Sequence, residues 1–297
     1  MITRSIYIGS PAYLKLKDEQ MYIMEPSSNQ MKGKVSVEDL GLLMLDHFQI
    51  TISHQLIQKM MGNNVVVVSC DAHHLPHGIM LPLYGHTEHS DRIKDQLQAS
   101  EPLKKQLWKQ TIECKIENQK EVLRRLGNYY EPMMNYQNNV KSGDSTNMEG
   151  IAAQHYWKYL ISLDFLRQRF GESPNQFFNF GYAVLRSIVA RSIVETGLLP
   201  VLGIFHKNKY NPYCLADDLM EPYRPFVDWL VMDWLTKNPE IEELTKEFKA
   251  HLLQVATKDV WIDGKKRPLL VAVKTTASSL YKCYKGEKRL ISYPELV

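Results

Sequence analysis

The chain has little of what marks secreted, membrane-spanning and zinc-stabilised proteins. It has four cysteines in 297 residues. They form no Cys-X-X-Cys pair, which argues against a zinc ribbon or redox motif and favours free thiols in a reducing compartment. No apolar run reaches the roughly 20 residues needed to cross a bilayer, and the first residues, MITRSIYIGSPAYLKLK, lack the apolar core of a secretory signal. We therefore expect a cytoplasmic protein with no membrane partner.

The chain also lacks a strong net charge, internal repeats and low-complexity segments. The formal net charge is +3, from 36 Lys and Arg against 33 Asp and Glu. Residues 1–100 hold 8 basic and 10 acidic residues, which leaves 28 basic and 23 acidic residues for the remainder. The basic excess in the C-terminal two-thirds permits a polyanionic partner such as DNA. An ordinary solvated surface is the alternative.

The first 90 residues have the pattern of short strands separated by turns. The expected strands are Arg4–Ile8, Tyr13–Lys17, Gln20–Met24, Val35–Val37 and Val65–Val68. Two helices are expected among them, one starting at Ser36–Asp39 and one at Thr51–Ser53. These segments predict a small β-rich domain.

From about Asp91 the apolar residues recur at helical spacing. After a polar break, helices are expected at Met148–Phe170, Gln176–Thr196, Leu215–Leu235, Ile241–Ala256 and Leu269–Tyr284. A β-hairpin is expected around Asp263–Gly264. The predicted class is therefore α+β, with a β-rich domain at residues 1–90 and a larger all-α domain at residues 91–297.

Glu149 lies at the start of an expected helix and has two interpretations. Thr146 to Glu149 matches a capping box, in which the glutamate satisfies backbone N–H groups. Ala152 and Ala153, one turn further, would allow another element to approach the carboxylate closely, as a functional site requires.

A second acidic cluster follows His206. Asp217 and Glu221 are four residues apart, and Asp218 and Glu221 three apart, so either pair can share a helix face. Arg224 could neutralise part of that charge. The cluster is either a solvated helix face or a site for a bound cation.

The loop between His206 and the cluster mixes positive charge, amides and aromatic rings, which suits contact with phosphates and bases. The candidate DNA-binding residues are Lys207, Lys209, Tyr210, Asn211 and Tyr213. An ordinary surface loop is the alternative.

A competing metal site lies upstream. Residues 70–89 carry one cysteine and five histidines, ligand types that suit zinc. The residues are Cys70, His73, His74, His77, His86 and His89. Their spacing matches no familiar zinc pattern, so a zinc-dependent hydrolase stays an alternative.

Several motifs in order resemble the CRISPR-associated protein one family, the spacer-acquisition integrases of prokaryotic adaptive immunity. The matching residues are Glu149-Gly150 with Ala152, Ala153, Tyr156 and Trp157; Asn179 to Tyr182; Gly197-Leu198 with Pro200, Gly203 and His206; and Asp218 to Pro222 with Arg224-Pro225. The resemblance extends over essentially the whole chain and is greatest to the branch that accompanies type II systems.

The resemblance implies that Glu149, His206 and Glu221 are catalytic and hold a metal. Two carboxylates and an imidazole suit Mg²⁺ or Mn²⁺. The acids Asp217 and Asp218, together with Arg224, would support these ligands. The implied reaction joins the 3′-OH ends of short foreign DNA to the repeat borders of a CRISPR array, and the same site could cleave or resolve branched DNA.

The resemblance also implies partners. They are double-stranded DNA, a second copy of the chain bound through the N-terminal domain, CRISPR-associated protein two bridging two such dimers, and further type II acquisition proteins. A non-catalytic DNA-binding scaffold of the acquisition complex is the alternative function.

Overall fold

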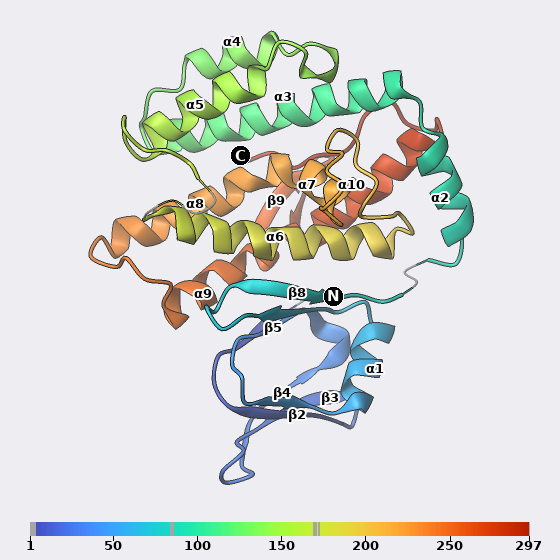
Figure 1. Ribbon diagram of the computed structural model, residues 1–297, viewed down its shortest axis with the longest axis vertical. Helices are drawn as coiled ribbons and strands as arrows, with labels where there is room; N and C mark the ends of the chain where they lie inside the picture. Colours follow the sequence, from blue (N-terminus) through green and yellow to red (C-terminus); the bar gives the residue numbers. More distant parts are fainter. Residues whose placement is uncertain (1–3, 84–85, 169–170, 172, 297) are drawn as a thin grey trace.

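The computed structural model describes residues 4–83, 86–168, 171 and 173–296. The N-terminal part contains two four-stranded sheets and one helix (Figure 1). Its elements are β1 Arg4–Ile8, β2 Ala12–Lys17, β3 Gln20–Met24, β4 Met31–Ser36, β5 Leu40–Leu45, β6 Ile50–Ile52, α1 His54–Gly62, β7 Val66–Cys70 and β8 Pro76–Met80. The strand orders are β1-β5-β7-β8 and β4-β3-β2-β6.

The central strand β5 corrects one expectation. The helix expected to start at Ser36–Asp39 is only a short 3-10 turn, Val37–Asp39, which leads directly into β5. The sequence of β5, LGLLML, is buried along almost its whole length between β1 and β7, to which it runs parallel. A continuous apolar run is typical of a parallel strand that is buried on both faces.

The C-terminal part is helical, with one small hairpin. Its helices are α2 His89–Gln98, α3 Glu101–Arg125, α4 Pro132–Asn138, α5 Met148–Leu160, α6 Asn175–Glu195, α7 Cys214–Met220, α8 Arg224–Lys237, α9 Lys246–Leu253 and α10 Leu269–Tyr284. Short 3-10 turns lie at Ser142–Asp144 (η2), Glu221–Tyr223 (η3) and Gln254–Thr257 (η4), and the hairpin consists of β9 Asp259–Ile262 and β10 Lys265–Pro268. The predicted α+β class, with a β-rich part followed by a helical part, is confirmed.

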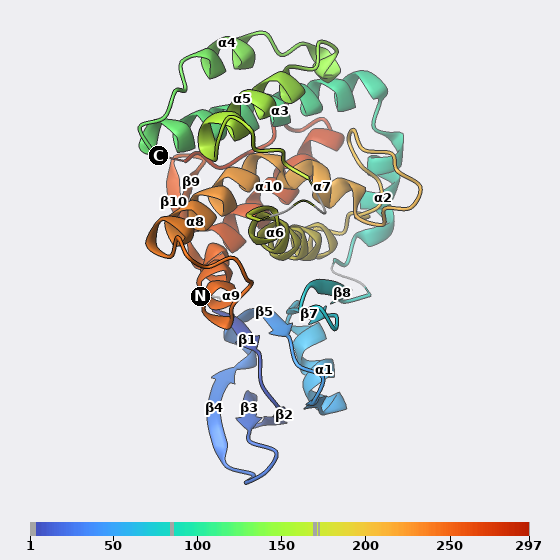
Figure 2. The same ribbon diagram turned by 60° about the vertical axis from the view of Figure 1, so that its left-hand side comes forward.

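Helix α6 runs through the middle of the helical part and is seen nearly end-on in Figure 2. Among the described residues it is the one helix long and apolar enough to cross a membrane by length and composition, yet 78% of its apolar window is buried inside the fold. It packs against α7, α8 and α10. The apolar character of α6 therefore belongs to a core helix.

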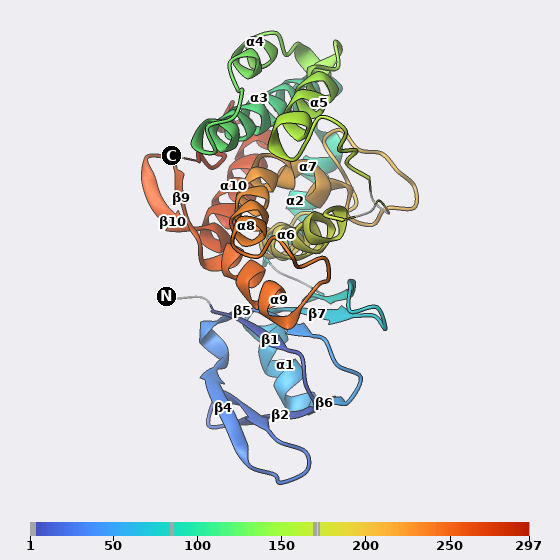
Figure 3. The ribbon, with the colours of Figure 1, turned by 90° about the vertical axis from the view of Figure 1, so that its left-hand side faces the viewer.

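The two parts share a core. On the sheet β1-β5-β7-β8, the side chains of Leu42, Met44, Val66 and Val68 join the hydrophobic cluster of the helices, whereas Leu43 and other residues of the opposite face join the N-terminal cluster. Figure 3 shows this sheet lying directly beneath α6 and α9. The last N-terminal strand ends at Met80 and the first helix begins at His89, so the boundary at residue 90 stays a prediction.

Three expected helices are shorter than predicted. Helix α5 ends at Leu160, and Phe165 donates to the carbonyl of Ser162 in a turn; Phe170 lies outside the described residues. The helix expected at 215–235 is interrupted by the 3-10 turn η3, where Pro222 has no N–H to donate. The helix expected at 241–256 begins only at Lys246, after the Thr245 N-cap.

Candidate active site

A buried lysine lies between the two glutamates of the predicted site. The ammonium of Lys115, on α3, is 2.6 Å from Glu149 Oε1 and 2.6 Å from Glu221 Oε2. Burial acts to lower the pKa of Lys115, but the charges of Glu221 and Glu149 outweigh it and raise the pKa. The acids therefore cluster around a cation that the chain itself supplies.

Glu149 is held by the start of α5, but not through a capping box. Asp144, in the preceding turn, accepts hydrogen bonds from the backbone N–H groups of Met148 and Glu149 at 2.8 and 3.0 Å. The N-cap of α5 is Asn147 and not Thr146, and the side chain of Asn147 makes no capping hydrogen bond. The capping-box interpretation is thus wrong, and the carboxylate of Glu149 is free to reach Lys115.

Glu221 lies in a turn that is hydrogen-bonded to α3. Asn118 Nδ2 on α3 donates to the carbonyl of Pro222 at 2.8 Å. Glu221 itself is only 4% exposed, and Arg224 Nε lies 2.9 Å from its Oε1. Burial acts to raise the pKa of Glu221, but Arg224 and Lys115 lower it below the ordinary value, so the carboxylate stays ionised.

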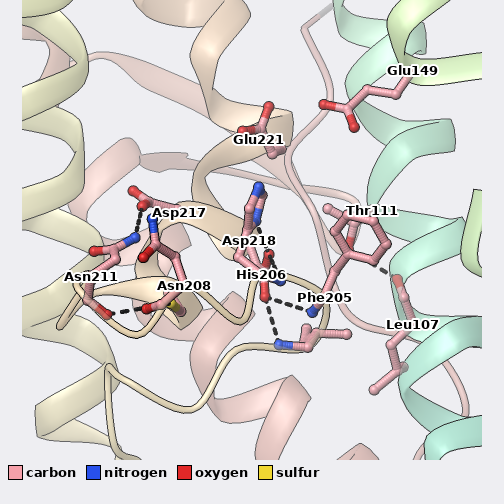
Figure 4. Close-up of polar contacts among 12 residues, drawn as sticks. Leu107, Thr111, Glu149, Phe205, His206, Asn208, Asn211, Asp217, Asp218 and Glu221 are labelled. Atoms are coloured by element: carbon pink, nitrogen blue, oxygen red, sulfur yellow. Dashed lines mark hydrogen bonds and ion pairs between the residues drawn. The ribbon is translucent and has the colours of Figure 1, made fainter. Parts of the chain in front are cut away.

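The imidazole of His206 is oriented by a hydrogen bond to Asp218. Its Nδ1 lies 2.5 Å from Asp218 Oδ1, and the same carboxylate accepts the backbone N–H groups of Ile204 and Phe205. The hydrogen bond from Asp218 raises the pKa of His206, whereas burial raises that of Asp218. With Nδ1 held by Asp218, the other ring nitrogen of His206 faces Glu221 (Figure 4).

The loop of His206 is fixed further by stacking and by a glycine. The Phe205 ring stacks on Trp108 of α3, with centroids 4.3 Å apart and an interplanar angle of 1°. A Cβ on Gly203 would lie 2.8 Å from Asp218 Oδ2, too close for any side chain. The turn around Asp218 therefore needs glycine at position 203.

Asp217 lines the same groove as the two glutamates but has partners of its own. It forms a bidentate pair with Arg186 of α6, at 2.7 and 2.8 Å, and accepts a 2.6 Å hydrogen bond from Asn211. Figure 4 shows Asp217 and Asn211 on the side of His206 opposite to Glu149. Asp217 therefore anchors the loop to α6.

The candidate DNA-binding loop divides into two groups. Tyr210 is 82% exposed, with the ammonium of Lys209 4.8 Å from its ring centroid, and Lys207 is also exposed, 3.3 Å from Glu101. Asn211 holds Asp217, and Tyr213 packs against the helical core. The side chains available to a partner at this loop are thus the two lysines and Tyr210.

A groove of about 700 Å³ opens beside the glutamates. Its lining includes four Lys and Arg side chains, which are Lys115, Arg167, Arg186 and Arg224, and also five carboxylates, which are Asp71, Glu149, Asp217, Glu221 and Asp228. The sequence reasoning missed Lys115, Arg167 and Arg186. For Lys115 a signal existed, because the lysine falls on the apolar face of α3, next to Ile112 and Ile116, where a solvated lysine is not expected.

The zinc alternative is not supported. His74 pairs with Asp46 at 2.8 Å, and His77 lies at the rim of the groove. Within the described ranges, residues 70–89 included apart from 84 and 85, no three His, Cys, Asp or Glu side chains come together as a metal-binding group. The high density of histidine in sequence is therefore not a cluster in space.

The donor set around Lys115 nevertheless suits a hard divalent cation. Two carboxylates and an imidazole are ligands for Mg²⁺ or Mn²⁺ rather than for thiolate-seeking metals. Glu221 Oε2 is a buried acceptor that receives no directed hydrogen bond, although the Lys115 ammonium is close. Among the described side chains, Glu149, His206 and Glu221 are likewise not grouped as three metal ligands; Lys115 pairs with both carboxylates instead. The residues fit the expected ion in chemistry.

Comparison with known proteins shows which family the chain resembles. A curated relative, the CRISPR-associated endonuclease Cas1 of Neisseria meningitidis serogroup C (strain 8013), is 33% identical over 281 residues, which cover 94% of this chain and 91% of the relative. A solved structure titled "Casposase bound to integration product" has a TM-score of 0.79 at 19% identity, covering 97% of this chain and 92% of the other.

Two more solved structures share the fold. A Cas6-RT-Cas1–Cas2 complex has a TM-score of 0.75 at 17% identity, covering 97% of this chain and 35% of the other. A TtCas1–DNA complex has a TM-score of 0.63 at 14% identity, covering 94% and 92%. Residues 6–262 match the family described as CRISPR associated protein Cas1. The chain therefore belongs to the Cas1 family.

Proposed function

We propose that the protein is a CRISPR adaptation integrase that joins the 3′-OH ends of short foreign DNA to the repeat borders of a CRISPR array. The supporting observation is the meeting of Glu149 and Glu221, from separate segments, at one cation position with His206 beside them (Figure 4). The names of its relatives, an endonuclease Cas1 and a casposase bound to an integration product, support a nuclease or integrase role.

The proposed ligands of one Mg²⁺ or Mn²⁺ are Glu149, His206 and Glu221. Such an ion polarises a phosphodiester and offsets the charge that builds on the attacking and leaving oxygens. Asp218 accepts a hydrogen bond from Nδ1–H of His206, which leaves the Nε2 lone pair free for the ligand position. Arg224 offsets the charge of Glu221 on its other oxygen.

The proposed reaction needs no covalent bond to the protein. The 3′-OH of the incoming DNA attacks a phosphodiester of the target strand, a new P–O bond forms, and the 3′ oxygen of the target strand leaves and takes up a proton. Arg167 and Arg186, which line the groove, would offset phosphate charge. The same site in reverse resolves branched DNA, and with water as nucleophile it cleaves DNA.

The proposed partners are DNA and Cas2. Solved structures of this fold titled as a Cas1–DNA complex and a Cas1–Cas2 complex support both. A homodimer, two of which are bridged by Cas2, further type II acquisition proteins and a cytoplasmic location complete the proposal. Lys207, Lys209 and Tyr210 are the proposed loop contacts to DNA.

The test is strand transfer and resolution on labelled branched DNA, which requires no knowledge of the repeat sequence. We expect Glu149→Ala, His206→Ala and Glu221→Ala each to abolish the reaction while the variants keep the circular dichroism spectrum of the wild type. Glu240→Gln, an exposed carboxylate after α8, is the matched control and should remain active. Full activity in one of the three alanine variants would remove that residue from the ligand set.

A non-catalytic DNA-binding scaffold is the second candidate. It is favoured by the ion pairs of Lys115, which already give both acids a structural partner. A scaffold would bind DNA equally well with EDTA or Mn²⁺ and would release no product in either. Product formation that needs Mn²⁺ and stops with EDTA would reject the scaffold.

A further inference from the structure

Lys115 balances the charge of the site without any added ion. The two carboxylates of Glu149 and Glu221 face two cations: Lys115 pairs with both of them, and Arg224 pairs with Glu221. The Lys115 side chain is only 10% exposed. An ammonium is rarely buried unless it is paired, so the two acidic partners are what allow Lys115 to be buried here.

The backbone around Lys115 is rigid. Asn118, one turn further on α3, donates to the carbonyls of Pro222 and Pro294 at 2.8 and 3.0 Å and accepts from the N–H of Leu296 at 3.0 Å. The turn that carries Glu221 is thereby fixed against α3. A change in the distance between the Lys115 ammonium and the Glu221 carboxylate therefore has to come from the side chains rather than from a shift of α3 against the turn.

We propose that Lys115 is the internal counter-cation of the two glutamates and that a divalent ion must displace its ammonium, so that Lys115 sets the metal concentration at which the site is loaded. The inference rests on the metal-dependent function proposed above. A Mg²⁺ ion binds carboxylate oxygens at about 2.0–2.1 Å. An ammonium 2.6 Å from the same two oxygens occupies the same space.

Charge leads to the same conclusion. The charges of the four side chains, two carboxylates and two cations, already cancel. If a divalent ion were added while the ammonium stayed, the partly buried site would carry two positive charges without a partner. Repulsion between charges is strong where the effective dielectric constant is low. Withdrawal of the ammonium removes both the steric overlap and one of these charges.

The lysine has space to withdraw. Lys115, Glu149 and Ala153 line the 700 Å³ groove together, and a lysine ammonium sits on a flexible four-carbon stem. On the Glu221 side the ammonium is close to Oε2 without a directed hydrogen bond. The contact there is held by charge more than by geometry, as a displaceable partner requires.

The experiment is Mn²⁺ titration of the full chain without DNA, followed by the electron paramagnetic resonance signal of free Mn²⁺. We expect Lys115→Met to bind Mn²⁺ about tenfold more tightly than the wild type or better, because the competing cation is gone. Lys115→Gln keeps the polarity of the position and should act in the same direction, which provides a second variant if the methionine protein folds poorly. Thermal unfolding should show a larger Mn²⁺-induced rise in Tm for both.

Two further variants separate the possible failures. Lys237→Met removes an exposed lysine, which pairs with Asp233, and should leave Mn²⁺ affinity unchanged. Glu149→Gln should weaken Mn²⁺ binding; if it does not, the metal site itself is refuted. If Glu149→Gln weakens binding but Lys115→Met and Lys115→Gln leave it unchanged or weaker, the metal site stands and the role of Lys115 as competitor is refuted.

Discussion

Two buried lysines in this protein have opposite surroundings. Lys249 of α9 donates to Asp46 at 2.7 Å and to the carbonyl of His74 at 3.1 Å, and Asp46 also accepts from Tyr7 at 2.6 Å. Lys115 lies between two carboxylates beside an open groove, and polar atoms of Glu221 and Arg224 next to it lack a directed hydrogen bond. A buried charge in a complete hydrogen-bond network typically has a structural role. A buried charge in an incomplete network can exchange its partner for another ion more easily.

The joint at Lys249 connects the two parts of the chain. Tyr7, Asp46 and His74 come from the N-terminal part, and Lys249 comes from the helical part. Burial acts to raise the pKa of Asp46, but the hydrogen bonds from Lys249, Tyr7 and His74 lower it below the ordinary value. The ionised carboxylate is thus the form that the fold stabilises.

The largest effect is expected from breaking this joint. Lys249→Met leaves Asp46 charged, buried and without its cation, and removal of one partner of a buried pair typically lowers the free energy of unfolding by about 3–5 kcal/mol. Urea unfolding measures the change. Lys237→Met, an exposed lysine paired with Asp233, is the control and should change stability by less than about 1 kcal/mol. Equal losses in the two variants would contradict the structural role of the joint.

The buried carboxylate of Asp228 sharpens the comparison, because its hydrogen-bond donors are neutral hydroxyls rather than a lysine. Asp228 accepts from the hydroxyls of Tyr156 and Tyr182, and burial raises its pKa from 3.8 to about 6. Between about pH 4 and pH 6 the folded state holds a proton that the unfolded state has released. The contribution of Asp228 to stability is therefore favourable at low pH and is lost as the pH rises through about 6.

Asp228→Asn should remove that dependence. Relative to wild type, we expect the variant to gain up to about 3 kcal/mol between pH 4 and pH 7, since one pKa unit corresponds to about 1.4 kcal/mol. Urea midpoints across this range measure it. For Asp46→Asn the relative change with pH should have the opposite sign and should lie below about pH 4, because the pKa of Asp46 is lowered from 3.8. The same sign in both variants would contradict the comparison.

A smaller effect tests how the site is held. Asp218→Asn keeps an acceptor for the turn but loses the charge beside His206, and loss of such a supporting carboxylate typically weakens metal binding by about 10–100-fold. Mn²⁺ titration provides the value. Asp217→Asn alters the neighbouring carboxylate that pairs with Arg186 and should leave the affinity for Mn²⁺ unaffected. Equal weakening in both would mean that Asp218 has no special role.

The smallest effect is expected at exposed lysines. Lys207→Ala combined with Lys209→Ala should leave stability unchanged and weaken DNA binding with a reduced dependence on salt, because fewer counterions are released. Fluorescence anisotropy at several salt concentrations measures the slope. The double variant Lys282→Ala and Lys285→Ala, at the end of α10, removes the same charge elsewhere. An unchanged slope for the first pair would exclude the loop from the DNA contact.

Most of the elements were predictable, because their sequence periods are strong. The final helix, Leu269–Tyr284, begins and ends where the apolar pattern does. Residues Ser36–Asp39 predict the start of a helix, whereas the structure has a 3-10 turn followed by β5, because the short apolar run of β5 has no period that distinguishes a strand from a helix. Its burial between two parallel strands depends on contacts distant in sequence.

The site was predictable in part. Glu149, His206 and Glu221 were indicated by motif, and the structure brings the two glutamates within reach of one ammonium. Lys115 and Asn118 carry no motif, and their roles depend on how α3 crosses the turn at Pro222. Periodicity can show that a lysine lies on an apolar face, but the carboxylates that it meets are set by tertiary packing.

The hydrogen bond between α3 and the turn at Pro222 also has a consequence for chains whose synthesis is incomplete. A growing chain contains Lys115 and Glu149 early, but Glu221 follows only much later, and the backbone groups of Pro294 and Leu296 that hold Asn118 come later still. A nascent chain that stops before Glu221 has one acid beside Lys115 and no second one. Prematurely terminated products therefore lack the pair of carboxylates that contacts Lys115 in the complete fold.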